Sequence, residues 1–332
     1  MITPSLGDQA RLLSLTRMSG ALRHDITARM QELSSGQRAD LSIALGGDHG
    51  RLARIDSAHS TADAYLQVAR GMTLSLEVAQ SAVAALGDGL GKLRNTLHLA
   101  VQTGTAATLD QVTAEADSAF RDAVASLNTA PAGRSLFAGM RSDGPALAPA
   151  DTMLTALRNA IAAAPAPQDA VAMIEAWFAP GGGFDSIGYL GGPAAGVPLR
   201  LGDGARMAPP PTAADPGMRT TLAALAVAAL SADTPGGQTA QRQMLGHAAA
   251  GATGAGDALV QIAAGIGRSQ ALVDRAESAA QAQIAALDRA RIALTAADPF
   301  ETAVRLEDTM RRLEALFSVT ARSARMTLTG YL

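Results

Sequence analysis

The stretch RLARIDSAHSTADAYLQVARGMTLSLEVAQSAVAALGDGLGKLRNTLHLA, residues 51–100, decides the fold. Apolar residues recur along it at steps of three and four from Leu52 to Ala100, and His59 is the one polar residue on that stripe. Such spacing places the apolar side chains on one face of an α-helix. A helix this long predicts packing against other long helices in the manner of a coiled coil, although the glycines at 87, 89 and 91 would allow a break.

A second long stripe lies in the C-terminal half of the chain, from Leu259 to Leu294. A new helix is expected directly after it, because Asp298 can cap a helix, Pro299 suits the first helical position and Glu301 suits the third. This last helix carries apolar residues to the end of the given sequence.

The N-terminal end shows the same arrangement of a shorter helix followed by a long one. A helix is expected from about Pro4 to Leu33, with Thr3 as its cap and the SSG sequence at 34–36 as its stop. The two long helices are therefore expected to lie side by side, with the chain folding back on itself between them.

The middle of the chain has a different character. The segment from Pro180 to Gly217 holds 17 residues that are glycine or proline, out of 33 glycines and 15 prolines in the whole chain. This density excludes a helix there and predicts turns, loops or short strands. The sequence thus predicts a mainly α fold of long antiparallel helices with a small irregular α+β insert. Three regions are expected: terminal assembly helices (1–36 plus 299–332), a helical core (37–145 plus 218–298) and an outer insert (146–217).

Composition excludes several classes of function. The chain has no cysteine, which removes disulfides, thiolate metal sites and cysteine nucleophiles. Its net charge of −3 gives no electrostatic reason to expect a nucleic-acid partner. The sequence shows neither a cleavable secretory signal nor an apolar run long enough to cross a membrane.

Three stretches partly match catalytic or nucleotide-binding motifs, but each lacks a feature that its motif needs. The stretch GDGLGKL at 87–93 has a leucine where a phosphate loop needs serine or threonine, and GATGAG at 251–256 follows no strand. Ser135 lacks the second glycine of a nucleophile elbow, because Phe137 occupies that position. We therefore expect no catalytic, cofactor-binding or metal-binding residues, and no enzyme activity.

The apolar stripes of the two terminal helices are the functional signal of the sequence. Two such helices that packed only on each other would be marginally stable, and an uncovered apolar stripe is a surface for partners. The expected assembly residues are Leu15, Met18, Leu22, Ile26, Leu33, Leu306, Met310, Leu313, Phe317, Leu328, Tyr331 and Leu332.

Three segments resemble the flagellin superfamily, and within it most closely the hook-associated proteins of the hook–filament junction. They are MQELSSGQRADLSIALGGDHGRLARIDSAHSTADAY at 30–65, RSLFAGMRSDGPAL at 134–147 and LTAADPFETAVRLEDTMRRLEALFSVTARSARMTLTGYL at 294–332. The resemblance covers residues 1–145 and 220–332 and leaves the insert outside it.

The resemblance implies a structural protein of the bacterial flagellum that is exported without a cleaved signal and acts outside the cell. It implies self-assembly through the terminal helices, contacts with another hook-associated protein and flagellin, and an export chaperone, with no cofactor, nucleic acid or membrane. A short flagellin stays open as an alternative. A surface-displayed adhesin is the second alternative, in which aromatic side chains of the insert would stack on a sugar; these are Trp177, Phe178, Phe184 and Tyr189.

Overall fold

The computed structural model describes residues 6–47, 49–194, 198–202 and 206–329. The helices are α1 (Leu6–Ser35), α2 (Leu41–Ala44), α3 (Gly50–Thr103), α4 (Ala106–Leu127), α5 (Ala150–Ile161), α6 (Pro167–Phe178), α7 (Pro216–Ala229), α8 (Gly237–Thr295) and α9 (Pro299–Thr329). Shorter elements are the 3-10 turns η1 (Pro131–Gly133) and η3 (Ser231–Asp233), the π-helical turn η2 (Phe184–Gly188), and the strands β1 (Leu199–Arg200) and β2 (Arg206–Met207). The two strands form an antiparallel pair in the insert. The predicted mainly α fold with long helices and a small insert is confirmed.

The chain forms two compact units, and α3 and α8 contribute to both. Unit 1 comprises Met1–Asp63 and Ala282–Leu332, and unit 2 comprises Ala64–Gln281. In each unit α3 and α8 run antiparallel and are joined by polar side-chain contacts. In unit 1 Asp56 forms an ion pair with Arg291, and His59 contacts Asp288; in unit 2 Arg70 forms an ion pair with Glu277. The predicted division into three regions stays a prediction.

Several helix boundaries differ from those expected. Helix α3 passes through Gly87 without a break, and α8 begins well before Leu259 and includes all the glycines between 251 and 256. The glycines are tolerated because the long helices gain their stability from packing, which outweighs a local propensity cost. Helix α4 is capped by Thr105, whose hydroxyl accepts a hydrogen bond from the Thr108 amide at 3.4 Å. The sequence also allows a cap at Thr108, with Gln111 as the third helical residue, but the helix begins one turn earlier.

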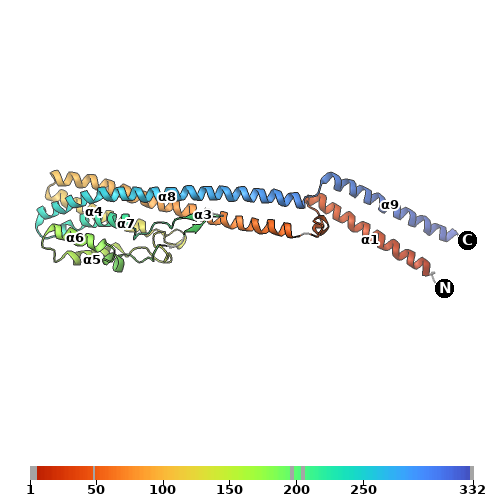
Figure 1. Cartoon of the computed structure of the whole chain (residues 1–332), viewed down its shortest axis with the longest axis horizontal. Coiled ribbons are helices and arrows are strands. Elements are labelled where there is room, and N and C mark those ends of the chain that lie inside the picture. The colour runs from red at the N-terminus through yellow and green to blue at the C-terminus, as the bar shows by residue number, and fades with distance from the viewer. Residues whose placement is uncertain (1–5, 48, 195–197, 203–205, 330–332) are drawn as a thin grey trace. The chain divides into compact units, whose positions relative to one another are not determined.

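Unit 2 holds a dense apolar core. In this unit α4–α7 gather beside α3 and α8 (Figure 1), with α4 packed on α7 and α6 packed between α5 and α7. The seam of α3 predicted from Leu76 to Ala100 is buried in this core, and Phe120 of α4 is fully buried. Burial of large apolar side chains is the main driving force for folding, so unit 2 contains most of the stabilising apolar surface of the chain.

The aromatic cluster of the insert belongs to the same core. The rings of Trp177, Phe178 and Phe184 meet edge-on or tilted with centroids 4.8 to 6.1 Å apart, and Phe184 is fully buried. Tyr189 stacks on Phe184 and donates its hydroxyl to the Gly192 carbonyl at 2.7 Å. These rings are packed against one another, so they do not present the exposed stacking face that sugar binding would need.

Arg219 of α7 braces the aromatic cluster. Its guanidinium lies 4.8 Å above the Phe184 ring, donates to the carbonyl of Phe178 and pairs with Asp185. The Gly181 amide and Arg219 together hold the pKa of Asp185 below its ordinary value. The segment 131–147 has the pattern of a turn, a short strand and a second turn, but in the structure its pairing is a single bridge from Leu147 to Tyr189, because turns occupy most of it.

Candidate assembly surface on the terminal helices

Helices α1 and α9 pack against each other as an antiparallel pair in unit 1 (Figure 1). The covered positions of each helix recur at steps of three and four, the repeat of a coiled-coil seam. On α9 the residues that are buried or half-buried at this spacing are Thr302, Leu306, Thr309, Leu313, Leu316 and Thr320. On α1 they are Leu15, Ser19, Leu22, Ile26 and Arg29.

This seam lacks the large buried side chains of an ordinary core. Across the described part of unit 1, the buried residues are Glu32, Ala62, Thr295, Thr302 and Thr309. None of them is a large apolar residue, so the helix pair gains little of the free energy that burial of leucine or phenylalanine provides in unit 2. The pair is formed by half-covered leucines and buried threonines.

Large apolar side chains of unit 1 instead face solvent. On α9, Met310 is 38% exposed and Phe317 is 46% exposed, and the two lie seven residues apart beside the covered seam. Phe300 and Val304, near the start of α9, are 80% and 53% exposed. Further exposed apolar residues of unit 1 are Leu13, Met18, Met30, Leu33, Ile43, Ile292 and Val319.

We call Met310 and Phe317 of α9 the outer stripe. Phe317 is flanked by Arg23 of α1, whose guanidinium carbon lies 5.8 Å from the ring centroid. A single exposed apolar residue is ordinary, but several of them on helices that lack a core of their own make this surface the candidate site for partners.

The predicted assembly residues therefore divide into two groups. Leu15, Leu22, Ile26, Leu306 and Leu313 are half-buried in the seam between the helices, whereas Met18, Leu33, Met310 and Phe317 are exposed.

The remaining predicted residues lie at the end of α9. The backbone of Leu328 continues that helix, but its side chain lies outside the described set, as do Tyr331 and Leu332 altogether.

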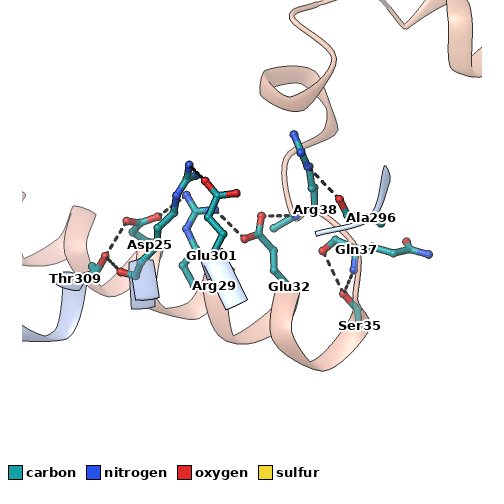
Figure 2. Close-up of polar contacts among 11 residues, drawn as sticks. Asp25, Arg29, Glu32, Ser35, Gln37, Arg38, Ala296, Glu301 and Thr309 are labelled. Atoms are coloured by element: carbon teal, nitrogen blue, oxygen red, sulfur yellow. Dashed lines mark hydrogen bonds and ion pairs between the residues drawn. The ribbon is translucent and has the colours of Figure 1, made fainter. Parts of the chain in front are cut away.

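A polar network closes the end of the helix pair (Figure 2). Glu32 is the only charged residue that is buried among those the structure describes. Its two oxygens accept hydrogen bonds from the Arg29 guanidinium at 2.8 Å and from the Ala39 amide at 3.0 Å. Arg29 also pairs with Asp25 at 3.2 Å, and Asp25 accepts from the Thr309 hydroxyl at 3.3 Å. The network thus joins α1, α9 and the loop that follows α1.

Backbone hydrogen bonds fasten the same loop to the turn between α8 and α9. Gly36 ends α1 with a φ of 68°, a left-handed conformation that glycine adopts without strain. The Arg38 amide donates to the Thr295 carbonyl at 2.9 Å, and the Ala297 amide donates to the Gly36 carbonyl at 3.0 Å. Asp298 then caps α9 by accepting from the Phe300 and Glu301 amides, which confirms the predicted cap.

Sequence reasoning missed both the polar network and part of the exposed apolar surface. No motif in the sequence indicates Glu32, Arg29 or Asp25, because the burial of Glu32 depends on the loop that returns over it. Phe300 lies outside the series of covered positions on α9, so helical periodicity does not indicate its exposure.

Metal binding and membrane spanning were the other functions that the described residues could have indicated. No group of three or more His, Asp or Glu side chains there is placed to hold a metal ion. Nor does any described helix have the length and apolar character needed to cross a membrane. His59, the polar residue on the long stripe, pairs with Asp288 at 3.3 Å.

Comparison with known proteins identifies a shared fold. No protein-family model matches the chain, and no curated protein matches it. Among solved structures, a chain from Vibrio parahaemolyticus, described provisionally as a flagellar hook-associated protein, superposes with a TM-score of 0.51. The two sequences are 13% identical, and the match covers 73% of this chain and 94% of the other. The arrangement of long helices seen here is therefore one that a solved structure already contains.

Proposed function

We propose that this chain is a structural subunit of the bacterial flagellum, a hook-associated protein that joins the hook to the filament. It assembles through α1 and α9, whose uncovered apolar side chains pack against neighbouring subunits. It is not an enzyme, and its assembly needs no cofactor.

The observation that carries the proposal is a contrast within the helix pair: the outer stripe is exposed, whereas the seam between α1 and α9 buries no large apolar side chain that the structure describes. Met310 and Phe317 remain exposed, while the buried residues of the described helix pair are threonines and Glu32. A helix pair of this kind gains more by packing with many copies than by standing alone. Filament-like assembly supplies those neighbours.

Two further observations support the flagellar assignment. The order of segments at both ends resembles the flagellin superfamily, and the fold matches a structure described provisionally as a flagellar hook-associated protein. The partners proposed are other copies of this chain, a second hook-associated protein and flagellin, with a chaperone during export. The proposed location is the flagellum outside the cell.

Deletion of the gene tests the proposal in the organism that encodes it. A strain without the protein is expected to secrete flagellin into the medium and to lack attached filaments, because the junction that retains them is missing. Restoring the full chain should restore attached filaments. Normal filaments in the deletion strain would refute the junction role.

The same strains separate a junction protein from a short flagellin. A filament subunit must greatly outnumber a junction subunit in purified flagella. We expect few copies of this chain per flagellum, at the base of the filament, as measured by quantitative mass spectrometry and labelled electron microscopy. A copy number equal to that of the major filament protein would favour the flagellin alternative.

A further inference from the structure

The charges of the α1–α9 pair are segregated along its length. The N-terminal end of α1 lies beside the C-terminal end of α9 (Figure 1), and Asp25 of α1 contacts Thr309 of α9. We call residues 6–23 of α1 and 311–329 of α9 the tip half, and the rest of the two helices the base half. The tip half has seven arginines and two acidic residues, whereas the base half has two arginines and five acidic residues.

The tip half presents exposed arginines next to apolar side chains. Arg11, Arg17 and Arg322 are exposed, and none of them forms an ion pair among the side chains that the structure describes. The exposed apolar residues of this half are Leu13, Met18, Phe317 and Val319. Two copies packed in parallel at the same height would set the arginines against one another, and like charges in contact oppose association.

The base half presents acidic residues next to apolar side chains. Glu301, Glu307 and Asp308 are exposed, and each pairs with the arginine four residues further along α9. Such exposed pairs contribute little to stability, and a carboxylate has room for a second donor, so these acids can accept an arginine from outside. The exposed apolar residues of α9 in this half are Phe300, Val304 and Met310.

From these two surfaces we infer that the partner of the tip half is the base half of a second copy of this chain. Each half offers apolar side chains to the other, and their opposite charges favour the contact. Copies that point the same way meet in this manner when they are displaced along the helix axis by about 20 Å, comparable with the length of one half. The inference rests on the proposed assembly through α1 and α9, and it deepens that proposal by naming the surfaces that meet.

Charge reversal with rescue tests this pairing on the purified full chain. The tip variant is Arg11→Glu, Arg17→Glu and Arg322→Glu, and the base variant is Glu301→Arg with Glu307→Arg. The replaced side chains are all exposed, and circular dichroism checks that the helices remain. Self-association is measured by sedimentation velocity over a range of concentrations at low ionic strength, where charges are screened least.

Each variant alone gives the tip and base halves charges of the same sign. We therefore expect each to associate at least about ten-fold more weakly than the unchanged chain. A chain with both sets of substitutions again has halves of opposite sign, and it should associate at least about three-fold more tightly than either variant. Association in either variant that equals that of the unchanged chain, or no recovery in the combined chain, would overturn the inference.

The matched control makes the same change of net charge in unit 2. Arg200→Glu, Arg268→Glu and Arg275→Glu reverse three exposed arginines there. This chain should associate within about two-fold of the unchanged one, because the pairing depends on the location of the charges and not on their total. A loss as large as that of the tip variant would mean that net charge alone governs association, and the inference would fail.

A milder variant serves if a reversed chain loses helix content. Arg11→Gln, Arg17→Gln and Arg322→Gln remove the tip charges, and glutamine favours helix about as well as arginine does. We expect association at least about three-fold weaker than that of the unchanged chain. An unaltered association constant would contradict the pairing.

The solution measurement and the deletion strain fail independently. If the deletion strain refutes the flagellar role, sedimentation still decides whether tip and base halves pair. If the unchanged chain does not self-associate at any soluble concentration, the pairing is wrong even where the deletion strain lacks attached filaments.

Discussion

Units 1 and 2 are built from the same kind of helix but use their apolar residues in opposite ways. Unit 2 buries leucines and aromatic rings such as Phe120, Phe137 and Phe184 completely. Unit 1 leaves Phe300 and Phe317 exposed, and the described residues that it buries are small or polar. The contrast shows that unit 2 has an apolar core of its own, whereas unit 1 leaves its large apolar side chains uncovered, as the proposed assembly through α1 and α9 would require.

The largest expected consequence is a difference in local opening of the isolated chain. Helices with few buried apolar contacts open at a low free energy, and well-packed ones open only near global unfolding. We expect backbone amides of α1 and α9 to exchange with deuterium at least about a hundred-fold faster than those of α4 and α7.

Limited trypsin digestion gives an independent check, because arginines such as Arg17, Arg311 and Arg121 occur in both units. The terminal helices should be trimmed first, and a fragment that contains unit 2 should persist. If the terminal helices and unit 2 of a dilute monomer were equally protected from trypsin, the proposed difference in stability between the units would be wrong.

A second prediction concerns the size of core effects. Phe120→Ala removes a fully buried ring from α4 and should lower the free energy of unfolding of unit 2 by about 3–5 kcal/mol, measured by urea denaturation. Phe317→Ala removes an exposed ring of unit 1. It should change the free energy of unfolding measured in the same way by less than about 0.5 kcal/mol. Comparable losses for the two substitutions would show that Phe317 belongs to a core.

A smaller effect is expected within the seam itself. Leu313→Ala shortens a half-buried leucine between α9 and α1, and only part of its transfer free energy is at stake. We expect the opening free energy of the helix pair to fall by about 1 kcal/mol, measured by hydrogen exchange of α9 amides. A loss as large as that from Phe120→Ala would contradict the description of the seam as a poor core.

The smallest effect concerns the polar bracing of unit 2. Because the pKa of Asp185 is lowered in the folded chain by the Gly181 amide and Arg219, its carboxylate stabilises the fold at neutral pH. Asp185→Asn should therefore lower the melting temperature slightly at pH 7. The difference from the unchanged chain should shrink as the pH falls below about 4 and the carboxylate takes up a proton. A difference that persisted unchanged in acid would exclude this electrostatic origin.

The sequence was sufficient for the architecture but not for its polar details. The stripes from Leu52 to Ala100 and at the two ends follow from helical periodicity, which packing reinforces, so the long helices could be predicted. The start of α8 at Gly237 could not, because tertiary packing overrides the low helix propensity of its glycines. The polar network around Glu32 was hidden for another reason: the burial of Glu32 depends on the loop that returns over it, and the turn between α8 and α9 holds that loop in place.

The sequence predicts that the terminal helices carry an apolar face, but not which residues of that face are exposed. The spacing of Leu306, Met310, Leu313 and Phe317 predicts one apolar face, and it cannot indicate which half of that face the other helix covers. The structure makes that division, with the leucines half-covered and the outer stripe exposed.

The central claim is that the exposed apolar surface of unit 1, and not that of unit 2, is buried between subunits. Complementing the deletion strain with Met310→Glu plus Phe317→Glu tests it directly. The matched control is Leu74→Glu plus Val260→Glu, which places the same charges on exposed apolar positions of unit 2, 59% and 64% exposed. We expect the control chain to be retained in purified flagella, whereas the outer-stripe variant should be exported but not retained. Retention of the outer-stripe variant at the level of the unchanged chain would contradict the central claim.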